Sequence, residues 1–210
     1  MPKKISRKSQ IKKNRAIILK AAKELFFKRG FYNTTMEEIA RYSGLDRRTL
    51  YNHFKNKEDI LASLISEIIT RIGEIYNDID LSGIPPIKKL KTLALQLLDV
   101  YMENSELLNI FKRGANKKQE MAISVFMMEN IITYKEIEAR LVQIIKDAQD
   151  EGVVIDIHPY ILAGLFNEMI LRSVFVWHNY NKDLTKDDII NNIIKVMEEG
   201  FIKKPTSSDK

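Results

Sequence analysis

The sequence contains no cysteine, which excludes disulfide bonds, thiolate-bound metals and cysteine-based redox chemistry. It has three histidines, His53, His158 and His178, too few to favour a metal site built from histidine alone. It also lacks a zinc-protease "HExxH", a glycine-rich phosphate loop and any recognisable grouping of nucleophile, acid and base. We therefore expect no catalytic residues, no metal, no cofactor and no enzymatic activity.

Glycine and proline are scarce, with eight and five residues in 210, which favours helical structure. No uninterrupted apolar run approaches the roughly 18 residues that a membrane-spanning helix needs. The basic N-terminus is not followed by an apolar signal core or a cleavage site. The sequence therefore predicts a cytoplasmic protein without a membrane partner.

Acidic residues are missing from the start of the chain, where the first is Glu24. Residues 1–60 hold 16 basic and 6 acidic side chains, a net charge of +10, whereas residues 61–210 hold 18 and 22, a net charge of −4. A basic first third joined to a mildly acidic remainder indicates that one end binds a polyanion. A merely solvated basic surface is the alternative interpretation.

Apolar residues recur with helical periodicity almost everywhere, and no segment alternates as a half-buried strand does. The predicted fold class is all-α, with an N-terminal three-helix helix-turn-helix domain joined to a C-terminal helical domain and about nine helices in total. Capping residues and glycines set the expected helices at residues 9–29, 35–43, 47–54, 57–72, 87–103, 106–115, 118–151, 159–179 and 186–202.

The predicted organisation has four parts, defined by charge, capping signals and composition. Residues 1–10 form a basic arm, and residues 11–60 form the helix-turn-helix domain. Residues 61–203 form a C-terminal helical domain. Residues 204–210 form a flexible tail.

The segment "DRRTLYNHF" concentrates hydrogen-bonding side chains on one short predicted helix. Gly44 supplies a tight turn before it and Asp46 can cap it, so the two short helices make a helix-turn-helix unit. If Leu50 and Phe54 face inward, the polar side chains face outward and suit a DNA major groove, where arginine reads guanine and asparagine reads adenine. The predicted base-facing residues are Arg47, Arg48, Thr49, Asn52 and His53.

Phosphate contacts are predicted around this helix, since they fix the register of a protein on DNA without reading sequence. Helix capping by Thr35 and packing or phosphate contact by His53 remain open as alternatives. The predicted phosphate-contacting residues are Thr34, Thr35, Tyr51, Lys55 and Lys57.

The first 65 residues resemble the DNA-binding domain of the tetracycline-repressor (TetR) family. The resemblance rests on "AA..LF...G" from Ala21, "TT...IA" from Thr34, "SGL" from Ser43 and "TLYNHFKNKEDIL" from Thr49. Where such proteins often have a small residue before "TLY", this chain has Arg47 and Arg48, so its base preference does not follow from the family.

The resemblance implies a homodimeric repressor that binds double-stranded DNA at a near-palindromic operator. It further implies that residues 61–203 bind an effector and dimerise, with dimerisation through the last two helices and release from the operator by a small, largely apolar effector. An alternative is a DNA-bound adaptor whose C-terminal helices dock a protein partner without a small ligand.

The C-terminal helices support part of this picture. Apolar residues surround most of the helix predicted at 159–179, which is typical of a helix buried on two sides, by its own core and by a second subunit. A monomer with a central helix is the alternative. Bulky or adaptable side chains give the candidate effector contacts, although each also suits an ordinary core: Tyr101, Phe111, Met121, Phe126, Met128, Tyr134, Phe166, Asn167, Met169 and Trp177.

Overall fold

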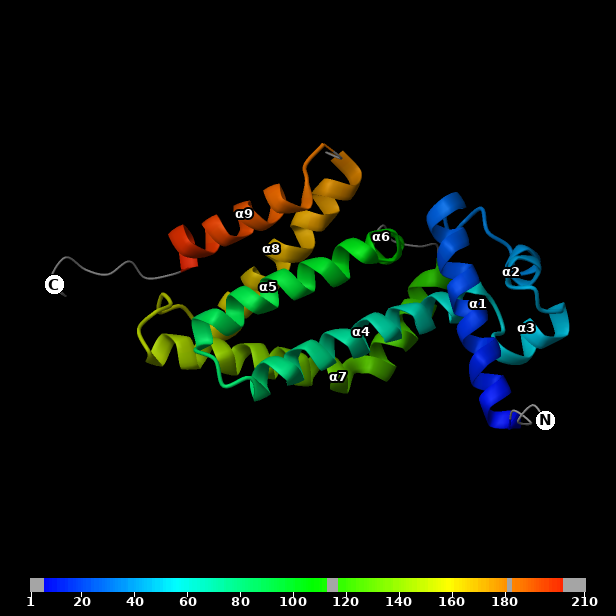
Figure 1. Ribbon diagram of the computed structural model, residues 1–210, viewed down its shortest axis with the longest axis horizontal. Coiled ribbons are helices and arrows are strands. Elements are labelled where there is room, and N and C mark those ends of the chain that lie inside the picture. The colour runs from blue at the N-terminus through cyan, green and yellow to red at the C-terminus, as the bar shows by residue number, and fades with distance from the viewer. Residues whose placement is uncertain (1–5, 113–116, 181–182, 202–210) are drawn as a thin grey trace, which may run out of the picture. The chain divides into compact units, whose positions relative to one another are not determined.

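The computed structural model describes the backbone of residues 6–112, 117–180 and 183–201, and the side chains of residues 6–108, 132–180 and 183–200. The regular elements in this part of the chain are helices, which confirms the predicted all-α class (Figure 1). They are α1 (Arg7–Arg29), α2 (Met36–Ser43), α3 (Arg47–His53), α4 (Lys57–Leu81), α5 (Pro86–Glu103), α6 (Ser105–Lys112), α7 (Lys117–Asp150), α8 (Pro159–Tyr180), α9 (Lys186–Val196) and a π-helical turn (Met197–Phe201).

The chain divides into two compact units by its internal contacts. Unit 1 draws on residues 1–67 and 106–129, and unit 2 on residues 68–105 and 130–210. The long helix α4 belongs to both units, because the division falls between Glu67 and Ile68. The inclusion of residues 106–129 in unit 1 is a feature that the sequence does not predict.

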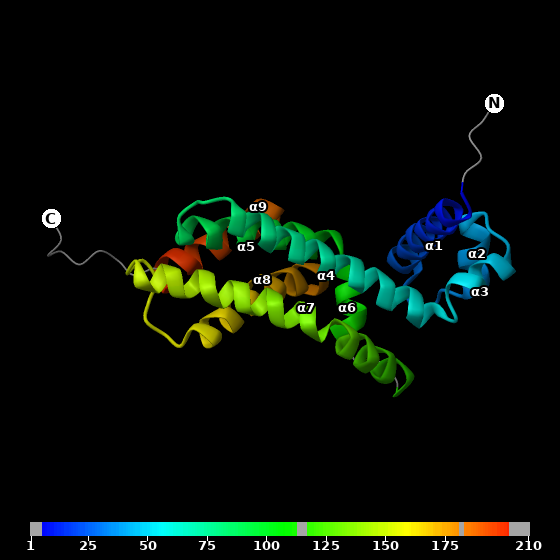
Figure 2. The ribbon, with the colours of Figure 1, turned by 90° about the horizontal axis from the view of Figure 1, so that it is seen from below.

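In unit 1, α1 packs against α2, and α2 packs against α3 (Figure 2). The apolar stripe of α1 is buried from Ile18 to Phe26, as its helical spacing predicts. Phe26 meets Phe31 edge to face, with 5.0 Å between the ring centres. The core that results holds the two short helices against α1; its members are each at most 3% exposed: Ile18, Ala22, Phe26, Phe31, Ile39, Leu50, Phe54 and Ile60.

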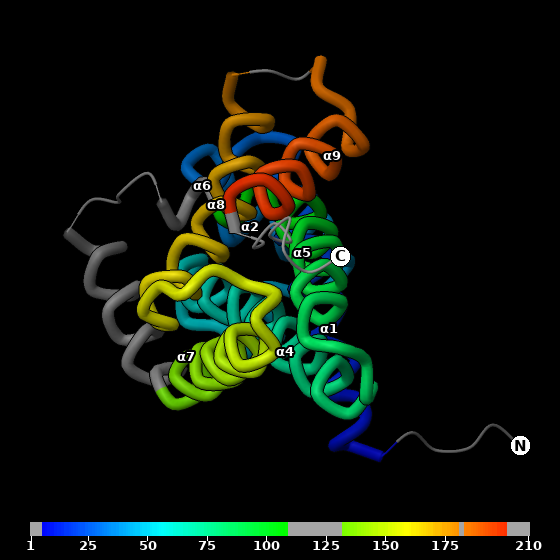
Figure 3. Tube along the Cα trace, turned by 90° about the vertical axis from the view of Figure 1, so that its left-hand side faces the viewer, coloured from blue at the N-terminus to red at the C-terminus, as the bar shows by residue number. Residues whose placement is uncertain are grey.

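In unit 2, α5 packs against α8 and α9, and α8 also contacts α9 (Figure 3). Arg140 of α7 donates to Asp80 of α4 across 3.2 Å, which joins the second halves of these two helices. Burying this aliphatic core supplies most of the driving force for folding, at about 25 cal/mol per Å² of apolar surface. Its fully buried members include Leu93, Leu97, Leu98, Leu141, Phe166 and Ile170.

Candidate nucleic-acid interface

Helix α2 is fixed at both ends by its own residues. The Thr35 hydroxyl accepts from the Glu38 N–H at 3.2 Å, and the Glu38 carboxylate accepts from the Thr35 N–H at 2.9 Å. These hydrogen bonds form the capping box that the spacing predicts, and they hold the pKa of Glu38 below its usual value. At the other end Gly44 adopts φ +68°, a left-handed conformation that glycine tolerates best. The turn into α3 is therefore set by local chemistry.

Helix α3 begins directly after this turn, with Asp46 as its N-cap. The Asp46 carboxylate accepts from the Thr49 N–H at 2.8 Å and from the Thr49 hydroxyl at 2.7 Å, and these bonds lower the pKa of Asp46. A helix of seven residues is not stable alone, so its packing must hold it. Leu50 is fully buried and Phe54, which follows the helix, is 3% exposed.

The outward face of α3 presents three of the five predicted base-facing residues, together with Tyr51. Arg47, Arg48 and Asn52 are exposed, and Tyr51 is 40% exposed. Arg47 pairs with Glu37 of α2 at 2.8 Å and lies over the Tyr51 ring, with 5.5 Å from the guanidinium carbon to the ring centre. This pair is exposed on both sides, so it costs little to break and leaves Arg47 available to a partner.

Three of the predicted contacts are engaged within the domain. Thr34 is 1% exposed, and its hydroxyl donates to the Gly30 carbonyl at 2.9 Å. Thr49 is half-buried with its hydroxyl on Asp46, and the Thr35 hydroxyl completes the α2 cap. Because Thr34 has almost no exposed surface for a phosphate, we leave it out of the DNA contacts proposed below.

Lys57, at the first position of α4, points into unit 1. Its ammonium donates to the carbonyls of Phe31, Tyr32 and Thr34 at 2.9, 3.3 and 3.1 Å, and lies 4.6 Å from the centre of the Phe31 ring. An ammonium has three N–H donors, so these carbonyls use all of them. Lys57 therefore connects the start of α4 to the loop before α2. Because its ammonium is already engaged, we do not propose it as a phosphate contact.

Arg15 is a structural contact that the sequence did not single out. Its guanidinium lies 4.6 Å from the centre of the Phe54 ring and donates to the Ser63 hydroxyl at 2.9 Å. Arg15 therefore joins α1 to the residue after α3 and to the first turns of α4. Its position in the apolar-stripe register of α1 was the only sequence signal for this role.

The remaining predicted contacts are accessible to differing degrees. Lys55 is exposed between α3 and α4, where its backbone N–H donates to the Asp59 carboxylate at 3.0 Å. His53 is half-buried beside Phe54, with 6.4 Å between their ring centres. Helices α2 and α3 thus bring Arg47, Arg48, Tyr51 and Asn52 onto one exposed face, with Lys55 at its edge.

Comparison with known proteins finds a family profile that matches the segment containing these helices. The profile of "Bacterial regulatory proteins, tetR family" matches residues 18–64, which run from the buried stripe of α1 into α4. Residues 18–64 therefore carry the sequence signature of the tetR family of bacterial regulatory proteins. Outside this segment the similarity to named regulators is more distant.

Two relatives show how far the TetR-family similarity extends. The regulator TtgR of Pseudomonas putida is 30% identical over 98 residues, which are 44% of this chain and 44% of that protein. The chain thus aligns with less than half the length of this relative. The regulator YhgD of Bacillus subtilis is 20% identical over 177 residues, 82% of this chain and 88% of that protein. Both are named HTH-type transcriptional regulators, and neither is named as an enzyme.

A solved structure shares the fold of nearly the whole chain. The ketosteroid transcriptional regulator KstR2 of Mycobacterium tuberculosis superposes with a TM-score of 0.72 at 21% identity. The match covers 90% of this chain and 95% of that one. At this identity the likeness establishes the fold that the two chains share and says nothing of a ligand.

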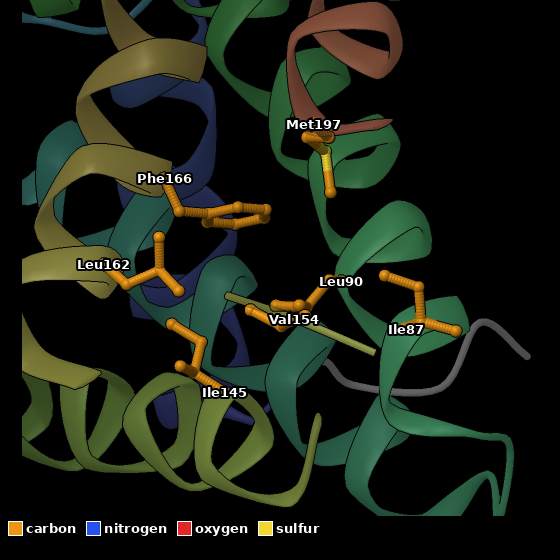
Figure 4. Close-up of a pocket in the computed structure, with 7 residues that line it drawn as sticks. All are labelled: Ile87, Leu90, Ile145, Val154, Leu162, Phe166 and Met197. Atoms are coloured by element: carbon orange, nitrogen blue, oxygen red, sulfur yellow. The ribbon is translucent and has the colours of Figure 1, made fainter. Parts of the chain in front are cut away.

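Unit 2 contains a small apolar cavity, shown in Figure 4. Its volume of about 10 Å³ has room for about one water molecule. Among the candidate effector contacts whose side chains are described, only Phe166 lines it; the lining residues are Ile87, Leu90, Ile145, Val154, Leu162, Phe166 and Met197. An apolar space of this size is a packing defect and does not hold an effector in this conformation.

The other candidate effector contacts are spread over three helices of unit 2. Tyr101 of α5, Tyr134 of α7 and Asn167, Met169 and Trp177 of α8 are half-buried. The side chains of Phe111, Met121, Phe126 and Met128 lie outside the described residues. The predicted set of effector contacts is therefore only partly placed, and it stays a prediction.

Tyr76 is a buried polar residue that the sequence did not reveal. It continues the apolar stripe of α4, four residues after Ile72, and is 1% exposed. Its hydroxyl has no hydrogen-bond partner among the described residues. Burial raises the pKa of Tyr76 above its usual value, with a smaller contribution from Tyr101. Burial likewise raises the pKa of Tyr101, where Tyr134 and Glu168 add to the effect.

Proposed function

We propose that this chain is a homodimeric, DNA-binding transcriptional repressor that reads a near-palindromic operator through α3. The carrying observation is the exposed set Arg47, Arg48, Tyr51 and Asn52, held on a short helix by its buried face. These side chains can donate to guanine and adenine edges or to phosphates, and they lie on a segment of net positive charge. The proposal places the protein in the cytoplasm, where its operator is.

The dimer is supported by the surface of α8. Tyr160, Ile161 and Leu165 are 53%, 57% and 51% exposed, although they are large and apolar. Within the described residues α8 is also the one helix long and apolar enough to span a membrane, yet only 28% of its apolar window is buried. A second subunit packed against α8 and α9 would cover this surface and present two copies of α3 about one DNA turn (roughly 34 Å) or more apart.

The effector part of the proposal rests on the interior of unit 2. A small, largely apolar effector suits its aliphatic core, and the unpartnered Tyr76 hydroxyl can donate to an acceptor on that ligand. The described cavity is too small for such an effector, so we propose that the effector binds a second conformation of unit 2. By binding this second conformation more tightly, the effector would raise its population. If the two copies of α3 no longer fit the operator in that conformation, the effector releases the protein from DNA.

A well-filled described core also favours the second candidate, a DNA-bound adaptor that docks a protein partner. A thermal-shift series with decanol, decanoic acid, decylamine and N-phenyl-1-naphthylamine separates the two candidates. A rise in melting temperature together with weaker operator binding supports the effector. Unchanged melting and unchanged operator binding with all four probes favour the adaptor.

The proposed function is tested by selecting bound fragments of the source genome at near-physiological salt. The control is the double variant Arg48→Ala/Tyr51→Ala, which removes two exposed side chains and leaves the buried face of α3 intact. We expect a near-palindromic site that the control does not recover. Equal, sequence-independent recovery by both proteins would contradict the proposal and leave only a general polyanion surface.

A further inference from the structure

The first three turns of α1, residues 7–17, contain no buried side chain. Ile11 is 49% exposed, and the first buried residue of the helix is Ile18. We call residues 7–17 the α1 extension. Packing against the rest of unit 1 accounts for Arg15 at the end of this segment but not for residues 7–13, which are all exposed.

The charges of the α1 extension are unfavourable for an isolated helix. It holds five basic residues and no acidic one: Arg7, Lys8, Lys12, Lys13 and Arg15. Cations at a helix N-terminus oppose the helix dipole, and Lys8 and Lys12 are like charges four residues apart. The supports within the extension are modest, a Ser6 cap with 3.2 Å to the Ser9 N–H and a Gln10–Asn14 hydrogen bond of 2.8 Å. A polyanion against this segment would remove the repulsion.

Four of these cations share one side of the helix. At 100° per residue, Arg7, Lys8, Lys12 and Arg15 fall within one half of the α1 circumference, and Lys13 falls on the other half. We call these four residues the α1 basic face. Ile18 and Ala22, which are buried in the helix-turn-helix core, lie in the same half. The α1 basic face therefore continues the side of α1 that holds α2 and α3.

Arg15 is the member of the α1 basic face that lies next to α3 and α4. Its guanidinium lies over Phe54, directly after α3, and donates to Ser63 of α4. Lys8 is seven residues earlier, so it lies about 10 Å farther along the α1 axis. Over about 10 Å of its axis, duplex DNA carries about six phosphate charges. The α1 basic face thus has the position, length and sign to follow a DNA backbone that passes α3.

We propose that Arg7, Lys8 and Lys12 of the α1 basic face form a second DNA contact, which binds backbone phosphates in the flank of the operator beyond the bases that α3 reads. This inference rests on the proposed function and adds to it the extent of the operator. Lysine and arginine on phosphates add affinity and salt dependence and carry no direct sequence information. The flanking contact therefore changes how long the operator must be, and leaves base preference to α3.

The test compares Arg7→Gln/Lys8→Gln/Lys12→Gln with the wild-type protein in a salt series. Two duplexes are used, one trimmed to the conserved bases of the selected site and one with about six more base pairs on each side. On the long duplex we expect the triple variant to lower the magnitude of the log–log salt slope by about 2 to 5, or about one to three phosphates per subunit at 0.9 each. On the trimmed duplex the two proteins should have similar slopes.

Two matched variants control for charge and position. Lys88→Gln/Lys135→Gln/Lys146→Gln removes the same net charge from unit 2, and Lys13→Gln removes the cation on the other half of the α1 extension. Neither should reproduce the effect of the triple variant. Because the substitutions relieve repulsion, the triple variant should keep its helical circular dichroism and should not melt at a lower temperature.

Each outcome decides the inference. Equal slopes for the triple variant and the wild-type protein on the long duplex overturn it, even if α3 still selects an operator. An equal loss of slope in the unit 2 control also overturns it, since that result reports net charge alone. If the wild-type protein selects no site, random duplexes of the two lengths are used; an unchanged slope there overturns the inference together with the proposed function.

Discussion

At the scale of single residues, Lys57 shows how a side chain that suits DNA can serve the fold. Its three carbonyl contacts predict that Lys57→Met lowers the melting temperature by several degrees and weakens operator binding. The salt slope of binding should nevertheless stay that of the wild-type protein, because no phosphate contact is lost. Calorimetry and a salt series of fluorescence anisotropy measure the two effects.

Lys55, two residues earlier, is the matched control for Lys57. It is exposed, so Lys55→Met should leave the melting temperature unchanged and reduce the magnitude of the dimer salt slope by about 1.8, for one phosphate per subunit. A reduced slope with unchanged melting in Lys57→Met would show that Lys57 leaves its carbonyls for a phosphate on the operator.

The second residue-scale prediction concerns Tyr76. A buried hydroxyl without a partner costs about 1–3 kcal/mol, and phenylalanine keeps the ring without that cost. We expect Tyr76→Phe to raise the free energy of unfolding by about 1 kcal/mol, measured by urea denaturation. Tyr134→Phe, at a half-buried site, is the control and should change it less. A loss of 1 kcal/mol or more in Tyr76→Phe would mean that its hydroxyl has a partner.

At the scale of elements, α2, α3 and α9 depend on carboxylate caps. Hydrogen bonds from Thr35, Thr49 and Thr185 lower the pKa values of Glu38, Asp46 and Asp188. A carboxyl whose pKa is lower in the folded state contributes stability above its unfolded pKa, and this contribution is lost as the pH falls through the folded value. These caps should therefore hold fully above about pH 5 and weaken below the usual Asp value of 3.8.

Asp46 gives a direct test of the caps. Asp46→Ala removes the N-cap of α3 and should lower the melting temperature at pH 7, whereas Asp46→Asn keeps a capping oxygen and should lower it less. Part of the acid-induced fall in melting temperature should disappear in Asp46→Asn, because its cap does not titrate. An identical pH dependence in that variant and the wild-type protein would contradict the role of this carboxylate.

The sequence predicts the ends of a helix well where the residues that determine them lie within a few positions of those ends. The caps at Thr35 and Asp46, the glycine at Gly44 and the apolar stripe of α1 act within a few residues, and the corresponding helices begin and end close to their predicted positions. The expected unbroken helix from Lys186 instead widens into a π-helical turn at Met197. This turn includes Gly200, a residue of low helix propensity.

The sequence did not predict contacts between residues that are far apart along the chain. Lys57 reaches carbonyls more than 20 positions earlier in the chain, and Arg15 reaches Ser63, so neither contact has a signal in its own segment. In the sequence, Tyr76 has the spacing of an ordinary member of the apolar stripe of α4. This spacing predicts that its side chain is buried, but it does not predict that the hydroxyl has no hydrogen-bond partner among the described residues. The exposed face of α3 was predictable because the buried residues Leu50 and Phe54 determine which side remains.

At the scale of the whole molecule, the exposed apolar surface of α8 predicts association. Ile161→Lys/Leu165→Lys places two charges on that surface, and sedimentation should show a monomer of about half the wild-type mass. The matched control is Leu81→Lys/Ile132→Lys, at side chains that are 79% and 69% exposed on α4 and α7, and it should stay dimeric. A wild-type protein that is monomeric at micromolar concentration would contradict the proposed dimer.

The central claim is that α3 reads DNA sequence, and the ratio of affinities for an operator and a scrambled duplex tests it most directly. The measurement uses the genome-selected site, near-physiological salt, the wild-type protein and Arg48→Ala. We predict a ratio of about 10³ or more for the wild-type protein, in the range of specific regulators. We predict a fall of about tenfold or more in Arg48→Ala, from the loss of one base contact per subunit. A wild-type ratio near one, or a ratio that Arg48→Ala leaves unchanged, would contradict the account.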